Sequence, residues 1–241
     1  MLQLDHKRRG LIVTGKSGTG KTSFLARYLT ASPGVRCRFV YDPDGPLSIR
    51  LGASPVFDAA GLVAAIGTGW VVFNPSRMFP GDNATGFDFF CRWAWTMSAR
   101  IPGRKIIAAD ELQKWTGTHR IKPGLALCLD TGRQHGLDSA FIAQGGNTVS
   151  DRVKAQTSEL VAFQLVTPRA LAWIEELGLD HERVARLPHL HFMAHDLDHG
   201  ATYWGRLDGG KVLVPGKSPA LPSISEPRRP GHKSPNRKKT S

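Results

Sequence analysis

Apolar residues occur along this chain in short blocks that alternate between buried-strand and amphipathic-helix patterns. Short apolar runs predict strands at 11–13, 36–41, 70–73, 106–109, 140–143 and 160–166. Helical patterns lie at 21–28, 58–66, 84–100, 123–134 and 168–177. Such alternation is typical of an α/β three-layer sandwich, in which helices cover both faces of a mainly parallel sheet. The runs 190–195 and 201–207 flank a polar turn that ends at Gly200, which predicts a C-terminal β-hairpin.

The composition changes near residue 215. We expect residues 1–214 to form one folded domain. Residues 215–241 are rich in Pro, Ser, Lys and Arg, and their seven basic residues and one acid give a charge of +6. This segment has little apolar surface to bury, so we expect a disordered tail. It is either an arm that contacts nucleic acid or a partner, or simply a solubilising end.

A glycine-rich segment follows the first predicted strand and precedes a predicted helix. It reads Gly15, Lys16, Ser17, Gly18, Thr19, Gly20, Lys21 and Thr22, which fits the pattern G-x-x-x-x-G-K-[ST]. In such a loop the backbone N–H groups surround a phosphate, and the lysine reaches the β- and γ-phosphates. The Thr22 hydroxyl can ligate Mg²⁺. The chain is therefore predicted to bind a nucleoside triphosphate together with Mg²⁺.

Two acidic residues end the predicted strand at 106–109. Asp110 suits the Mg²⁺ site, because an acid at such a strand end holds the ion in phosphoryl-transfer enzymes. Glu111 can orient or deprotonate a water molecule that attacks the γ-phosphate. The next strand, 140–143, ends at Gln144, whose amide can both donate and accept hydrogen bonds near that phosphate. These residues predict hydrolysis rather than binding alone.

Charge and cysteine content narrow the class of protein. The formal charge of +12 favours polyanionic partners, with nucleic acid first. Cys37, Cys91 and Cys128 are far apart in the sequence, which fits a reducing compartment. No run approaches the roughly 20 apolar residues of a membrane-spanning helix. Five histidines between 181 and 199 include metal-like spacings, but no cysteine or glutamate completes a compact zinc site.

The order of these motifs resembles the FtsK–HerA superfamily of DNA-pumping ATPases. The phosphate loop comes first, then a strand with Asp110 and Glu111, then a strand with Gln144. The segments 153–156, 160–165 and 167–171 continue the similarity, which spans roughly residues 10–205. The resemblance implies that Gly18 to Thr22 bind ATP phosphates and that Thr22 and Asp110 serve Mg²⁺. It makes Glu111 the catalytic base and Gln144 the sensor of the γ-phosphate.

The resemblance also implies a ring, usually a hexamer, in which an arginine from each neighbour completes the site. FtsK-type motors have an arginine just before the late strand, where this chain has Leu160. The arginine must then lie elsewhere, and Arg133 and Arg152 are the candidates. The basic region Lys114 to Lys122 is a candidate for the loop that contacts DNA in the pore.

Within the superfamily, this chain looks most like the genome-packaging ATPases of tailless, double-jelly-roll viruses. FtsK-type translocases carry membrane spans, for which this sequence has no candidate run, and HerA-type motors carry an N-terminal barrel ahead of the phosphate loop, which here begins at Gly15. The expected partners are double-stranded DNA and capsid vertex or portal proteins, in the host cytoplasm or the virion. The alternatives are another DNA-translocation or Zot-like phage-assembly ATPase, and a small-molecule kinase. A GTP-dependent switch ranks last because no N-K-x-D element is present.

Overall fold

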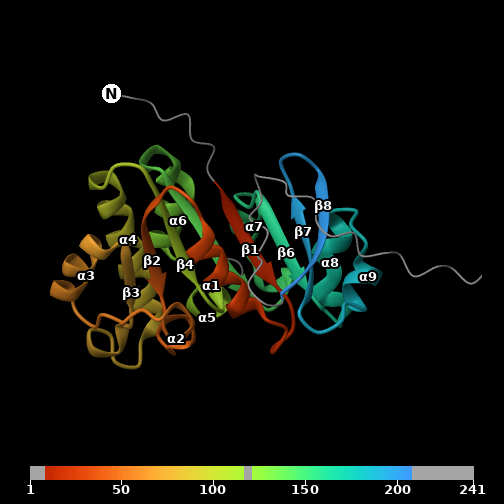
Figure 1. The fold of residues 1–241 in the computed structure, drawn as a ribbon, viewed down its shortest axis with the longest axis horizontal. Helices are drawn as coiled ribbons and strands as arrows, with labels where there is room; N and C mark the ends of the chain where they lie inside the picture. Colours follow the sequence, from red (N-terminus) through yellow and green to blue (C-terminus); the bar gives the residue numbers. More distant parts are fainter. Residues whose placement is uncertain (1–8, 117–120, 208–241) are drawn as a thin grey trace, which may run out of the picture.

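Eight strands form one sheet in the computed structural model, which describes residues 9–116 and 121–207 (Figure 1). The sheet order is β3-β2-β4-β5-β1-β6-β7-β8. The first six strands in this order are parallel to one another. The strand β7 pairs antiparallel with β6, and β8 pairs antiparallel with β7. The strands span Gly10–Thr14 (β1), Val35–Tyr41 (β2), Trp70–Phe73 (β3), Arg104–Ala109 (β4), Leu137–Ala143 (β5), Glu159–Phe163 (β6), His191–Asp196 (β7) and Ala201–Arg206 (β8). The predicted α/β sandwich with a C-terminal hairpin is thus confirmed. The predicted tail, 215–241, lies outside the described residues.

Helices cover both faces of the sheet (Figure 1). The helices α1 (Lys21–Ala31) and α2 (Pro46–Leu51) pack on one face. The helices α3 (Ala59–Ala65), α4 (Asn83–Arg100), α6 (Pro123–Thr131) and α8 (Pro168–Glu176) pack on the other. Alternate residues of β1 enter the two cores, with Leu11 and Val13 on the side of α1 and Ile12 on the side of α4. Both faces are therefore apolar, as the continuous apolar runs predict.

The predicted apolar stripe of residues 84–100 faces the core. Phe87, Phe90, Cys91 and Ala94 are fully buried on α4, and Met97 packs partly buried against them. Phe90 stacks on Phe73 with ring centroids 5.4 Å apart. These aromatic side chains therefore stabilise the core and are not available to stack on nucleic-acid bases.

Four short helices are absent from the sequence-based prediction. They are α2, α5 (Leu112–Trp115), α7 (Asp151–Lys154) and α9 (His181–Ala185). Each has six residues or fewer, which is too short to display a helical repeat of apolar positions. Four boundaries also differ by three residues: α1 continues to Ala31, β5 begins at Leu137, α6 ends at Thr131 before a 3₁₀ turn at Gly132–His135, and β6 ends at Phe163.

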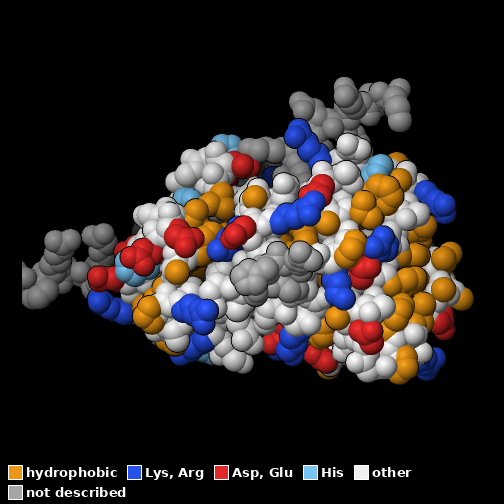
Figure 2. Space-filling model, turned by 180° about the vertical axis from the view of Figure 1, so that it is seen from behind, with side chains coloured by type: hydrophobic (Ala, Val, Ile, Leu, Met, Phe, Trp, Pro, Cys, Tyr) orange, Lys and Arg blue, Asp and Glu red, His pale blue; other side chains and the backbone are white. Residues whose placement is uncertain are grey.

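The surface differs between the two ends of the molecule. Figure 2 shows apolar side chains gathered toward the end where α3 and α4 lie, and acidic and basic side chains interspersed elsewhere on that face. Val63 of α3 is one of the exposed apolar residues. In the described residues, no helix is both long and apolar enough to span a membrane.

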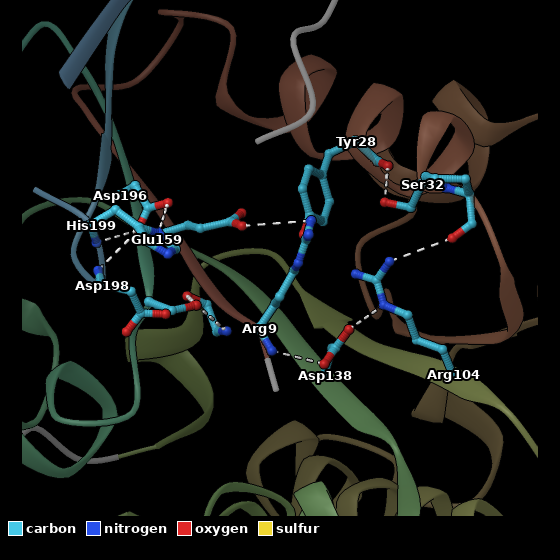
Figure 3. Close-up of polar contacts among 12 residues, drawn as sticks. Arg9, Tyr28, Ser32, Arg104, Asp138, Glu159, Asp196, Asp198 and His199 are labelled. Carbon is cyan, nitrogen blue, oxygen red and sulfur yellow. Dashed lines mark hydrogen bonds and ion pairs between the residues drawn. The ribbon is translucent and has the colours of Figure 1, made fainter. Parts of the chain in front are cut away.

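A polar network ties the amino ends of the parallel strands together (Figure 3). The Arg9 backbone N–H donates to Asp138 Oδ1 at 2.9 Å, and the Arg104 guanidinium pairs with Asp138 Oδ2. Arg104 Nη1 also reaches the Pro33 carbonyl, just after α1, at 3.4 Å. These contacts connect the starts of β1, β4 and β5 to the end of α1. Ligands bind at the carboxyl ends of the strands in open α/β sheets, and this network lies at the opposite edge.

Candidate nucleotide site

The strand order brings the predicted motifs together. The strand β5 lies between β1 and β4, so that Thr14 is level with Ala143 and Ala109 with Phe141. The phosphate loop follows β1, the acidic pair follows β4 and Gln144 follows β5. Because carboxyl ends of parallel strands meet at one edge of a sheet, all three motifs border the same pocket.

Glycines let the phosphate loop pass close to its neighbours. Gly20 has a φ of 106°, and a Cβ there would lie 2.9 Å from Leu190 Cδ2. Gly15 is equally confined, since its Cβ would lie 2.7 Å from Phe163 Cβ. The Lys16 N–H donates to the Gln164 carbonyl just after β6, at 2.9 Å. The loop is thus held against β6 and the segment before β7, a constraint that only glycine satisfies at these points.

Lys21 begins α1 and is buried in the loop. Its Nζ donates to the Lys16 carbonyl at 2.8 Å. Burial lowers the pKa of Lys21, and the nearby Asp110 and Glu111 carboxylates oppose that shift. The N-cap residue Gly20 has no side chain to satisfy the first N–H groups of α1. Those N–H groups and the Lys21 ammonium together form an anion-binding end of the helix.

Thr22 and Asp110 are in direct contact. The Thr22 hydroxyl donates to Asp110 Oδ2 at 2.7 Å, and the Glu111 N–H donates to Asp110 Oδ1 at 2.7 Å. Burial raises the pKa of Asp110, against the two hydrogen bonds that lower it. A hydroxyl and a carboxylate are the hard oxygen ligands that Mg²⁺ prefers. Two side chains do not complete the octahedral shell of Mg²⁺, so an ion held here would also take phosphate oxygens and water. The described ranges contain no group of three or more His, Cys, Asp and Glu that could hold a metal.

Glu111 has a strained backbone and both carboxylate oxygens engaged. Its φ is 49°, a left-handed conformation that is uncommon outside glycine and often marks functional sites. Gln144 Nε2 donates to Glu111 Oε1 at 3.0 Å. Lys114 Nζ forms an ion pair with Glu111 Oε2, which raises the pKa of Lys114, and lies 3.7 Å from Asp44 Oδ2. The two residues predicted to act on water are therefore hydrogen-bonded to each other.

The pocket at this edge has a volume of about 410 Å³. Its lining includes the predicted residues Ser17, Gly18, Gly20, Lys21, Thr22, Asp110, Glu111 and Gln144, and also Ser23, Pro46, Arg50 and Leu190.

Two of the lining residues that the sequence did not reveal are Arg50 and Leu190. Arg50 lies on α2, whose first N–H groups are capped by Asp42, with the Ser48 N–H donating to Asp42 Oδ2 at 2.7 Å. An aspartate ahead of Gly45 and Pro46 is a helix-start signal that could have revealed α2. No local signal indicates Leu190, which lies far from the phosphate loop in the sequence and is brought against Gly20 by the fold.

Arg133 and Arg152 lie away from this pocket. Arg133 is exposed in the 3₁₀ turn before β5, at the edge of the sheet opposite the phosphate loop. Arg152 lies on α7 and forms an ion pair with Asp130 of α6. Neither side chain lines the pocket of its own chain, so each would serve only a neighbouring copy. Their assignment as the partner arginine stays a prediction. Residues 117–120 of the predicted DNA-contacting region lie outside the described residues.

Solved structures show the same fold. The sequence matches no family model and no curated protein. The genome-packaging NTPase B204 from Sulfolobus turreted icosahedral virus 2, in complex with ATPγS, is 19% identical, with a TM-score of 0.64. That match covers 83% of this chain and 97% of that chain. The DNA-packaging ATPase B204 from Sulfolobus turreted icosahedral virus is 17% identical, with a TM-score of 0.64 and coverages of 82% and 97%. ATPases 2 and 3 of EccC from Thermomonospora curvata are 14% identical, with a TM-score of 0.51, over 83% of this chain and 36% of that chain. This chain therefore has the P-loop ATPase fold that these proteins share.

Proposed function

We propose that this protein is an ATP-hydrolysing motor that translocates double-stranded DNA and packages a viral genome into a preformed capsid. The observation that carries the hydrolysis part is the pocket itself. It places Lys21, the Thr22–Asp110 pair and the Glu111–Gln144 pair around one space at the end of the phosphate loop. Binding alone does not require a carboxylate and an amide at the position where a water molecule would attack.

In this proposal the loop residues Gly15 to Thr22 bind the phosphates of ATP. Mg²⁺ at Thr22 and Asp110 would neutralise charge on the phosphate oxygens. Glu111 accepts a proton from water as the water oxygen bonds to the γ-phosphorus and the bond to the β–γ bridging oxygen breaks, which releases ADP. Gln144 holds the Glu111 carboxylate and can hydrogen-bond the same water. The ion pair with Lys114 must loosen before Glu111 accepts that proton.

Two observations support a DNA motor. The folds of two B204 proteins, described as a genome-packaging NTPase and a DNA-packaging ATPase, extend over more than four-fifths of this chain. The formal charge of +12 suits contact with a phosphate backbone without reading the sequence. On the face in Figure 2 the two signs of charge are interspersed, so we expect DNA contacts from the basic region Lys114 to Lys122 and from the basic tail. In this proposal the protein forms a ring, most simply a hexamer, in the host cytoplasm. The ring binds a capsid vertex or portal protein.

The test compares ATP hydrolysis with and without double-stranded DNA in the wild type and in Glu111→Gln. We expect DNA to stimulate the wild type. We expect Glu111→Gln to bind ATP normally but to hydrolyse it about 10² to 10⁴ times more slowly, because the general base is lost. Glu176→Gln, a change at an exposed position on α8, is the matched control and should retain the wild-type rate.

Each outcome addresses a different part of the proposal. Full hydrolysis by Glu111→Gln would show that Glu111 is not the base, as expected of a kinase whose acceptor is a substrate hydroxyl. A rate that DNA leaves unchanged, in a protein that does not assemble with ATP and DNA, would refute the motor. Particle-size measurement in the presence of ATP and DNA provides that second readout.

A further inference from the structure

Arg50 is a cationic side chain at the nucleotide pocket that the phosphate-loop motif does not include. Its Nε donates to Ser23 Oγ at 3.1 Å, and its Nη1 donates to the Pro46 carbonyl at 3.2 Å. Its Nη2 atom makes no hydrogen bond within the part of the chain that the structure describes. The side chain is exposed, but these two bonds hold it over the first turn of α1, beside Thr22. A guanidinium so placed is preorganised and still has donors to offer.

The charged side chains that line the pocket nearly balance one another before a nucleotide binds. Lys21 and Arg50 are the basic side chains among the described lining residues, and Asp110 and Glu111 are the acidic ones. Lys21 is close enough to both carboxylates for them to affect its ionisation. The phosphate chain of a nucleotide adds several negative charges to this balance. Arg50 is therefore the lining cation whose charge the acidic pair does not already offset, since its hydrogen bonds go to a hydroxyl and a carbonyl.

The position of Arg50 indicates which phosphates it reaches. Glu111 and Gln144 mark the end of the pocket where water attacks, at the tips of β4 and β5. Arg50 comes from α2, which packs beside α1, and it contacts Ser23, one residue further along α1 than Thr22. The chain enters α1 from the loop, so Ser23 lies past the residues that surround the terminal phosphates. In a bound nucleotide, the phosphates that stay with the product would lie on this side of the pocket.

We propose that Arg50 is a nucleotide-binding residue that acts within its own chain, where its guanidinium contacts the α- and β-phosphate oxygens. This inference rests on the proposed nucleotide site, and it assigns Arg50 a role distinct from the arginine that a neighbour would supply. The anchoring of the first turn of α2 supports it, because the Leu47 and Ser48 N–H groups donate to the buried Asp42 carboxylate at 3.2 Å and 2.7 Å.

The first experiment measures dissociation constants for MgADP and MgATP and the hydrolysis parameters of Arg50→Ala. We expect both nucleotides to bind about 10 to 100 times more weakly, the range for a lost charge-assisted hydrogen bond pair. The KM for ATP should rise with them, while kcat changes less than about threefold, because ADP and the transition state lose the same contact. Arg50→Lys should recover part of the affinity, since it retains the charge without the planar fork. Arg100→Ala, at the far end of α4, is the control and should bind as the wild type does.

The outcomes separate this inference from the proposed function. A wild type that binds neither nucleotide refutes the nucleotide site as a whole. Unchanged affinities in Arg50→Ala, with a wild-type melting temperature, refute the contact with Arg50 alone. A fall in kcat with unchanged affinity for MgADP would place Arg50 on the transferred phosphate and overturn the assignment.

The second experiment tests whether Arg50 acts within its own chain. Chains carrying Arg50→Ala and chains carrying Lys21→Ala are co-expressed with different affinity tags and purified through both. Within one chain, Lys21→Ala removes nucleotide binding at its own site and Arg50→Ala weakens it at its own, so we expect the mixed assembly to bind MgATP no more tightly, and to have no lower KM, than Arg50→Ala alone. Recovery would show that Arg50 of one chain completes the site of another and would overturn the inference. Failure of the two chains to co-purify would itself exclude a role between chains.

Discussion

Glu159 provides a quantitative test of the buried network at the edge opposite the nucleotide site. It begins β6, is 6% exposed and lies level with Asp196 of β7, while Arg9 Nη1 is 3.8 Å from its Oε1 (Figure 3). In the described residues, Glu159 Oε2 is buried without a hydrogen-bond partner. Burial raises the pKa of Glu159 to about 7, with Asp196 and Asp138 adding to the rise and Arg9 and Arg104 opposing it. The folded protein therefore holds this proton more tightly than the unfolded chain does.

The sign of the pH dependence follows from proton binding. In the unfolded chain, Glu159 loses its proton near its ordinary value of 4.5. Between that value and about 7 the folded state binds more protons, so the free energy of unfolding falls as the pH rises. Each pH unit of difference corresponds to about 1.4 kcal/mol, so the ionised group costs the folded state roughly 3 kcal/mol above pH 7.

The assay is urea unfolding of the wild type and Glu159→Gln at pH 5 and pH 8. Glutamine has nearly the same shape and stays neutral, so the variant lacks this term. We expect the free energy of unfolding of the wild type to fall by roughly 2 to 3 kcal/mol more than that of the variant between the two pH values. Parallel pH dependences in the two proteins would show that Glu159 ionises normally and would refute the reasoning. Glu176→Gln, which is exposed, should follow the wild type.

Three further predictions concern the nucleotide site. Lys21→Ala should abolish ATP binding and turnover, measured by nucleotide titration and phosphate release, while the melting temperature stays that of the wild type; wild-type turnover would contradict the site. Gly20→Ala should destabilise the fold more than Gly18→Ala in urea unfolding. Both glycines adopt a positive φ, which is about 1 to 2 kcal/mol unfavourable for alanine, but only the Gly20 variant places a Cβ against Leu190. Equal losses of unfolding free energy would contradict this. Lys114→Met should raise DNA-free hydrolysis about two- to fivefold and weaken stimulation by DNA, because a half-exposed ion pair no longer holds the glutamate; a lower DNA-free rate would show that the lysine assists the base instead.

The order of apolar and polar residues predicted those strands and helices that are long enough to show a strand or helix pattern within their own residues. The strands that carry the site are apolar runs such as 106–109, and the phosphate loop needs glycines at positions that its own backbone conformation requires. The helix at 84–100 is long enough for several turns of apolar repeat, and α4 matches it within one residue. In contrast, α2 and α5 have six and four residues, so each offers at most one or two apolar spacings, too few to distinguish a helix from a loop.

The sequence by itself therefore determined the class of fold, the phosphate loop, and which polar residues end the strands. Only the tertiary structure decided that β5 lies between β1 and β4, which places Gln144 against Glu111. It also brought Arg50 and Leu190 to the pocket and placed Arg133 at the far edge of the sheet. The physical reason is that strand order and helix docking depend on how apolar faces are buried across the whole chain. A local pattern reports which face of a segment is apolar, but not which distant segment covers it.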